Sequence, residues 1–134
     1  MGNRAVITTK DNFENNGIGI YLHWNGGRDS VEAFLKYAEL KGVRGVEDDS
    51  SYFWARLCQL IGNFFGGTTS LGIEQVNKLD CDNWDNGVYL IDNNFKIVGR
   101  RYFEGEEQTS YDVDDMVDSI NKCQPEKEQI NLGG

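Results

Sequence analysis

The stretch YLHWNGGRDSVEAF, from Tyr21 to Phe34, constrains the fold of this chain more than any other. Apolar residues alternate with other residues from Ile18 to Trp24, which is the pattern of a half-buried β-strand. Asn25-Gly26-Gly27 comes next, and these residues adopt backbone angles that most others avoid. We therefore expect a strand that leads through a glycine elbow into a helix.

The helix after the elbow is predicted to run from about Ser30 to Lys41. Asp29 stands three residues before Glu32, which is a capping-box pattern with Asp in place of Ser or Thr. Gly42 is predicted to end the helix. One face is apolar, with residues at helical spacing: Val31, Phe34, Leu35 and Ala38.

Such an elbow suggests an anion site. Free N–H groups at a helix start attract anions, phosphate above all, and Gly26 and Gly27 would let a ligand approach the backbone. Arg28 stands beside them and would add a positive charge. The alternative is a tight strand-to-helix turn with a surface arginine, because the sequence is neither a Walker loop nor a complete GxGxxG motif.

The rest of the chain predicts an α+β fold with a mainly antiparallel sheet and about three helices. One domain is expected over residues 1–123, followed by a polar tail at 124–134 that is mobile or orders on a partner. The predicted order is β-β-α-α-β-β-β-α. The expected strands are 4–9, 18–24, 70–76, 88–92 and 95–99, the other helices are 51–65 and 112–122, and loops are expected at 11–17 and 79–87.

Composition narrows the classes of function. The formal net charge of −9 argues against direct DNA or RNA binding, which needs a basic face. The three cysteines form no CxxC pair, and no apolar run approaches the roughly 20 residues of a membrane span. The start of the chain lacks the apolar core of a signal peptide. A cytoplasmic protein without a membrane partner is expected.

Catalytic and metal motifs are not recognisable. His23 is the single histidine, and no nucleophile, base and orienting acid form a recognisable triad. Asp80, Asp82 and Asp85 are close together, but their spacing does not fit an EF-hand, so an Asx-rich turn is the simpler interpretation. We therefore expect a protein without catalytic residues, metal or cofactor.

A nucleotide site is suggested by residues scattered along the chain. Trp84 lies in a polar loop and could stack on a base, and Asn94 in the next turn could bond a base or ribose. Alternatively, Trp84 folds over the core and the arginines pair with nearby acids. Phosphates would be bound by arginines: Arg56, Arg100 and Arg101.

The segments GIGIYLHWNGGRDSVEAFL, YFWARLCQLIGNFFGG, LDCDNWDNGVYLID and QPEKEQ resemble a small-protein family of Firmicutes and their phages, specifically the first Thoeris anti-defence family. The resemblance covers nearly the whole chain. It implies a symmetric homo-oligomer, a dimer or hexamer, that sequesters cyclic ADP-ribose isomers and in some members cyclic oligonucleotides, without catalysis, in the host cytoplasm. It also implies binding surfaces at the elbow with Arg28 and at Trp84 and Asn94.

Two other classes of function remain open. An acidic inhibitor could block a basic nucleic-acid-binding surface, because residues 104–118 are densely acidic. A hydrolase of a nucleotide signal could use His23. The binding of a small cyclic nucleotide is the leading hypothesis.

Overall fold

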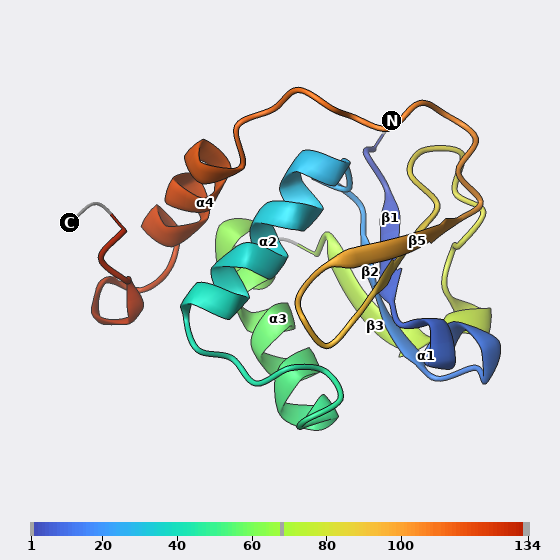
Figure 1. The fold of residues 1–134 in the computed structure, drawn as a ribbon, viewed down its shortest axis with the longest axis horizontal. Coiled ribbons are helices and arrows are strands. Elements are labelled where there is room, and N and C mark those ends of the chain that lie inside the picture. Colours follow the sequence, from blue (N-terminus) through green and yellow to red (C-terminus); the bar gives the residue numbers. More distant parts are fainter. Residues whose placement is uncertain (1, 68, 133–134) are drawn as a thin grey trace.

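The computed structural model describes residues 2–67 and 69–132. It is an α+β domain with one five-stranded mixed sheet, in the strand order β3-β2-β1-β4-β5 (Figure 1). The elements are β1 (Ala5–Thr8), α1 (Lys10–Glu14), β2 (Ile18–Leu22), α2 (Arg28–Leu40), α3 (Ser50–Phe64), β3 (Leu71–Gln75), the 3-10 helix η1 (Val76–Lys78), β4 (Val88–Ile91), β5 (Ile97–Arg101), α4 (Val113–Lys122) and the 3-10 helix η2 (Glu126–Glu128). The fold class expected from the sequence is confirmed.

Three of the four strand pairings are antiparallel, and β1 with β4 is parallel. The pairing therefore sets which loops meet. β1 and β4 begin at the same end of the sheet, where β2 and β5 finish: Leu22 pairs with Ala5, and Arg101 pairs with Val88. We call this the elbow end. The opposite end, where β4 turns into β5, is the turn end.

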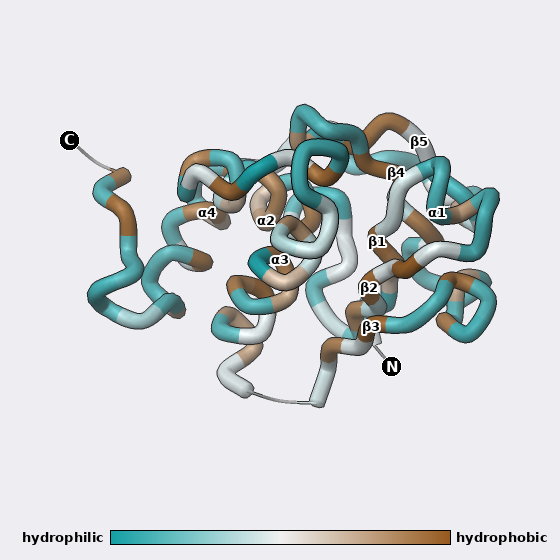
Figure 2. Tube along the Cα trace, turned by 90° about the horizontal axis from the view of Figure 1, so that it is seen from below, coloured by the Kyte–Doolittle hydropathy of each residue, from teal (hydrophilic) through white to brown (hydrophobic). Residues whose placement is uncertain are grey.

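Hydrophobic residues cover both faces of the two central strands. Every residue of β1 and β4 is buried, which fits strands covered on both sides. On one face, Ile7 and Tyr89 join the large core with α2, α3 and α4. On the other face, Val6 and Leu90 join a smaller cluster against Phe13 of α1. Figure 2 shows hydrophobic colour along the central strands and hydrophilic colour in the peripheral loops.

The loop expected at residues 11–17 is partly wrong, because Lys10–Glu14 forms the short helix α1. The hydroxyl of Thr9 accepts a hydrogen bond from the N–H of Asn12, 3.0 Å away, and so caps the helix. Phe13 then packs against the smaller cluster. A five-residue helix of this kind depends on that packing, which the Asn-rich sequence does not reveal.

The start of α2 differs from the predicted capping box. The helix begins at Arg28 with Gly27 as its N-cap, and Asp29 lies inside the first turn, where its carboxylate accepts from the N–H of Ser30. The positive backbone angle of the elbow belongs to Asn25, at φ 57°. Gly42, at φ 84°, follows the last turn as predicted and donates its N–H to the carbonyl of Glu39.

The β4–β5 turn also differs in detail. Asn93-Asn94 was expected to supply positive backbone angles, but the left-handed residue is Phe95, at φ 60°. Asp92 organises the turn, since its carboxylate accepts from the N–H groups of Asn94 and Lys96. Phe95 keeps this conformation while its ring packs 5.8 Å from the ring of Phe53.

The polar C-terminal segment, predicted to be a mobile tail or an arm that orders on a partner, contacts the domain through side-chain hydrogen bonds over residues 124–132. The buried amide of Gln124 donates to the carbonyls of Leu60 and Ile120. The side chain of Asn121 donates to the carbonyl of Ile130 and accepts from its N–H. Residues 133–134 of the expected tail lie outside the described residues.

No helix among the described residues is both long and apolar enough to cross a membrane.

Candidate functional site

The strand order brings most of the predicted site residues to the elbow end of the sheet. The glycine elbow follows β2, the Trp84 loop precedes β4, and the arginine pair closes β5. Asn94 lies instead at the turn end, and Arg56 is on α3. The six residues at the elbow end are Gly26, Gly27, Arg28, Trp84, Arg100 and Arg101.

The Trp84 loop is fixed by the residues on either side of the tryptophan. Asn83 is fully buried, donates to the carbonyls of Asp80 and Gly87, and accepts from the N–H groups of Asp85 and Gly87. Asp85 is bonded to the Arg4 guanidinium at 2.9 Å. This hydrogen bond holds the pKa of Asp85 below its usual value. The loop conformation is therefore specified by buried polar contacts.

Trp84 itself is 89% exposed and has a positive backbone angle, φ 66°. The sequence left open whether Trp84 is exposed or covers the core, and in the structure the ring is exposed. A large side chain in the left-handed region is uncommon and costs about 1–3 kcal/mol. The surrounding hydrogen bonds hold this conformation, so the protein presents an indole ring to solvent on a fixed support.

The two glycines of the elbow have different environments. Gly26 is buried: its N–H bonds the carbonyl of Asn3 and its carbonyl accepts from the hydroxyl of Tyr89. A Cβ at Gly26 would lie 2.8 Å from the Cβ of Ala5, so glycine is needed there for close packing. The backbone of Gly26 is thus used by the fold. Gly27 lines a cavity of about 260 Å³ beside it.

Arg28 is held by two carboxylates. Its Nε lies 2.9 Å from Glu32, one turn along α2, and its Nη1 lies 2.9 Å from Glu107. Burial lowers the pKa of Arg28, but the Glu32 hydrogen bond and the nearby charges of Glu107 and Glu32 outweigh this and raise it. Arg28 stays charged and points at the loop that follows β5.

Arg100 is held between two aromatic rings. Its guanidinium carbon lies 3.9 Å from the ring centre of Tyr89 and 3.7 Å from that of Phe103. It donates to the carbonyl of Asn86 at 2.7 Å and pairs with Glu107. Its Nε is buried and has no hydrogen-bond partner within the described chain.

Glu107 therefore bridges Arg28 and Arg100, which are far apart in sequence. We call the segment 103–111 the strap. It connects β5 to α4 and crosses the N-terminal end of α2 (Figure 1), where the side-chain oxygen of Gln108 accepts from the N–H of Asp29 at 3.0 Å. The elbow site is the cavity together with its cations and the strap contacts: Gly27, Arg28, Asn86, Tyr89, Arg100, Glu107 and Gln108.

The strap contacts were missed from sequence. The run Glu104 to Gln108 was interpreted only as part of an acidic surface, because nothing local links it to a helix start 79 residues earlier. The one available signal is that arginines at Arg28 and Arg100 in an acidic chain require anionic partners. The structure shows that the partner comes from the chain itself.

The remaining predicted residues do not join the elbow site. The guanidinium of Arg101 lies 5.7 Å from the ring of Phe13 and donates to the carbonyl of Arg100. Asn94 is exposed in the turn after β4. Its neighbour Asn93 accepts from the N–H of Glu47 at 2.8 Å, so this turn is tied to the α2–α3 connection.

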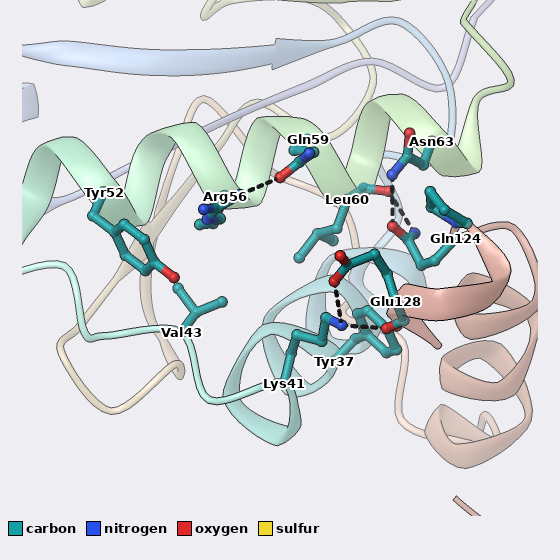
Figure 3. A pocket seen from close by; sticks show the side chains of 11 residues that line it. Tyr37, Lys41, Val43, Tyr52, Arg56, Gln59, Leu60, Asn63, Gln124 and Glu128 are labelled. Carbon is teal, nitrogen blue, oxygen red and sulfur yellow. Dashed lines mark hydrogen bonds and ion pairs between the residues drawn. The ribbon is translucent and has the colours of Figure 1, made fainter. Parts of the chain in front are cut away.

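Arg56 lines a separate cavity of about 320 Å³ between α3, the end of α2 and the C-terminal segment. Figure 3 shows Arg56 and Tyr52 on one side of α3, with Arg56 bonded to Gln59. Lys41 faces them from α2, but it is paired with Glu128. Arg56 therefore belongs to a different surface from Arg28 and Arg100.

His23 shares a hydrogen bond of 3.0 Å with the hydroxyl of Tyr21, and its ring packs edge-on against Trp24. These contacts give His23 a packing role at the end of β2. Among residues 2–67 and 69–132, no group of three or more His, Cys, Asp or Glu side chains is arranged to hold a metal ion.

Comparisons with known proteins found no protein-family model, curated protein or solved structure that matches this chain.

Proposed function

We propose that this protein is a non-enzymatic binding protein that sequesters a small cyclic nucleotide. The ligand class is that of the anti-defence family it resembles, cyclic ADP-ribose isomers and cyclic oligonucleotides, and the site of action is the host cytoplasm. The observation that carries the proposal is an exposed, rigidly held Trp84 at the same end of the sheet as two arginines, Arg28 and Arg100, that share one carboxylate.

Trp84 supplies a stacking surface for a base. Its ring is exposed while Asn83 and Asp85 fix its backbone, so little conformational freedom is lost when a ligand stacks on it. Stacking of a base on an aromatic side chain is worth about 1–3 kcal/mol. No packing role within the subunit accounts for the position of this ring.

Arg28 and Arg100 supply the charge that a phosphate requires. Both guanidinium groups are mostly buried and already share one anionic group, the Glu107 carboxylate. Guanidinium groups bind carboxylates and phosphates through the same planar arrangement of donors. The pair is thus suited to a phosphate in an acidic chain whose net charge would otherwise repel one.

The pocket is completed by a second copy of the chain. Trp84 and Asn94 lie at opposite ends of β4, whose four residues extend roughly 13 Å. One small ligand would therefore contact both residues only with Trp84 from one subunit and Asn94 from another. The homo-oligomer implied by the family resemblance, a dimer or hexamer, provides that second subunit.

Isothermal titration of the purified protein with cyclic ADP-ribose isomers and cyclic di- and trinucleotides tests the proposal. We expect saturable binding to at least one ligand, release of that ligand intact on heating, and weaker binding by Arg28→Ala. Lys36→Ala, which removes a cation two turns further along α2, is the matched control and should bind as the wild type does. A chemically altered ligand after heating would show an enzyme instead.

The acidic-inhibitor alternative rests on one observation, the exposed acidic strap with Glu104 and Glu106. Its partner would be a basic protein surface. Such binding should weaken steeply with salt, whereas a stacked nucleotide should be less sensitive. If no nucleotide in the panel binds and a basic nucleic-acid-binding protein binds in a strongly salt-dependent manner, the alternative replaces the leading proposal.

A further inference from the structure

From the elbow site we infer that Glu107 is a built-in anion that a ligand can replace. A phosphate group binds between Arg28 and Arg100 by displacing the Glu107 carboxylate. The strap opens when Glu107 is displaced. This rests on the proposed function only for the identity of the ligand. The exchange itself concerns any small phosphate or diphosphate.

The cations are held in place without Glu107. Arg100 lies between the rings of Tyr89 and Phe103 and also bonds the carbonyl of Asn86. Arg28 keeps its 2.9 Å bond to Glu32. The side chain of Arg100 is only 12% exposed and that of Arg28 only 23%. Both guanidinium groups are therefore preorganised for an anion, whichever group supplies it.

The carboxylate is the more exposed partner. The Glu107 side chain is 36% exposed and belongs to a segment in which every residue from 104 to 110 is exposed. Ion pairs that water can reach contribute little to stability, typically about 0–1 kcal/mol. Replacing Glu107 by another anion is thus far less costly than moving either arginine.

A phosphate would use donors that Glu107 leaves unpaired or that the strap occupies. Arg100 Nε is buried without a partner in the described chain, and a phosphate offers more acceptor oxygens than a carboxylate. The N–H of Asp29, at the start of α2, donates to the Gln108 side chain. Opening the strap frees this N–H, which lies at the positive end of the helix.

The strap is attached mainly by side chains that the exchange would release. Between β5 and α4 it forms no helix or strand within the described residues. Glu107 and Gln108 hold its middle, and Tyr111 holds its far end through the Glu32 and Arg28 side chains. Burial, followed by the hydrogen bond to Glu32, raises the pKa of Tyr111 to about 12. Tyr111 therefore remains a neutral donor during the exchange.

A tethered competitor weakens the apparent affinity by the fraction of time that the site is open. If the open state is populated at roughly 0.1–10%, removing the competitor tightens anion binding about tenfold or more. Removing the carboxylate of Glu107, an ion-pair partner of Arg28 and Arg100, should therefore raise the affinity of their site for an anion.

The test is titration of the full-length protein with inorganic pyrophosphate, comparing Glu107→Gln with Glu104→Gln. Both variants remove one strap carboxylate, but Glu104 is not an ion-pair partner of Arg28 or Arg100. We expect Glu107→Gln to bind pyrophosphate at least about tenfold more tightly than the wild type, and Glu104→Gln to match the wild type. The gain should vanish when Arg28→Ala is added to Glu107→Gln.

Limited digestion with a glutamate-specific protease reports the movement of the strap. Pyrophosphate should speed cleavage after Glu106 and Glu107 in the wild type, because these residues lie between Phe103 and Tyr111, whose contacts the exchange leaves in place. The inference is overturned if Glu107→Gln binds pyrophosphate no more tightly than Glu104→Gln, or if pyrophosphate binds without faster cleavage. Tighter pyrophosphate binding by Glu107→Gln without any nucleotide binding would leave the exchange intact and reject the proposed function. Nucleotide binding unaffected by Glu107→Gln would do the reverse.

Discussion

The two loops that flank β4 share one local arrangement, but they expose different side chains. In each loop a hydrogen-bonded asparagine directly precedes an exposed residue: Asn83 precedes Trp84, and Asn93 precedes Asn94. Asn83 is fully buried and closes its own loop, whereas Asn93 reaches across to the backbone of Glu47. The first loop holds an aromatic ring in solvent, and the second joins the hairpin to the helical layer.

The two ends of the sheet have different roles. At the elbow end, the Trp84 loop contacts Arg100 through the carbonyl of Asn86, and the strap covers Arg28 and Arg100; the exchange inferred above concerns this strap. At the turn end, hydrogen bonds from Asn93 to the α2–α3 connection and the packing of Phe95 serve the fold. Trp84 and Asn94 are both exposed, but the contacts around them favour a binding role for Trp84 more than for Asn94.

The largest expected effect is on stability, from Asn83→Ala. This variant removes the hydrogen-bond partner of backbone groups of Asp80, Asp85 and Gly87, of which those of Gly87 are buried, and should lower the free energy of unfolding by about 2–4 kcal/mol. Asn93→Ala, in the half-buried turn, should cost only about 0.5–1.5 kcal/mol. Urea unfolding of the two variants gives the comparison, and equal costs would show that the Trp84 loop is not the more rigid one.

Trp84→Ala should have the next largest effect, and it should act on binding. Loss of a stacking surface should weaken affinity for the bound nucleotide by about 1–3 kcal/mol. Because the ring is 89% exposed, the free energy of unfolding should change by less than about 0.5 kcal/mol.

The control for Trp84→Ala is Tyr52→Ala, which removes another exposed ring, from the Arg56 cavity on α3. It should leave titration curves for the nucleotide unchanged. If Tyr52→Ala weakens binding and Trp84→Ala does not, the ligand belongs to the Arg56 cavity and the functional argument for the elbow end fails.

A smaller effect is expected from the Arg4–Asp85 pair as pH changes. The folded-state pKa of Asp85 lies below its unfolded value, chiefly because of its hydrogen bond to Arg4. The pair therefore stabilises the fold fully above the unfolded pKa, near 3.9, and this contribution is lost as pH falls through the lower folded pKa.

Asp85→Asn should accordingly be less stable than the wild type at pH 6, and the gap should close below about pH 4. Urea unfolding between pH 3 and pH 6 measures this. Asp82→Asn, an exposed carboxylate in the same loop, is the control for the change in charge. A gap that stays constant with pH would mean that the Arg4 contact does not stabilise the Trp84 loop.

Asn94→Ala should have the smallest effect on the isolated subunit. The side chain is exposed, so the free energy of unfolding should change by less than about 0.5 kcal/mol. Its effect on binding decides whether both loops of β4 serve one ligand. Weaker nucleotide binding in a protein that light scattering shows to be oligomeric would support a shared pocket, whereas unchanged affinity would restrict the site to the elbow end.

Much of the fold could be predicted because its signals are local. The alternation along β2, the apolar face of α2 and the glycine after it are each patterns within a few residues. The helix α1 could not be predicted, because a helix this short depends on the packing of Phe13 on the sheet. The left-handed angle at Phe95 was missed for the same reason, since ring packing on Phe53 accompanies it.

The candidate site was predictable by residue type and not by arrangement. Trp84 was identified because a large aromatic residue in a polar loop is unusual, and the structure exposes it. Gly26 was assigned to a ligand, yet it is needed for packing against the backbone near Ala5. Arg56 and Asn94 had suitable chemistry but lie on other surfaces, because sequence distance does not reveal which loops the strand order brings together.

From the sequence alone follow the fold class, most of the strands and helices, and the presence of arginines and a loop tryptophan in an acidic chain. The tertiary structure alone decided that Arg28 and Glu107, 79 residues apart, meet over the start of α2, and that Arg100 lies between two rings beside them. The physical reason is one of range. Backbone hydrogen bonding and periodic burial act within a few residues, whereas charge pairing across the sheet depends on strand order and on the path of the strap.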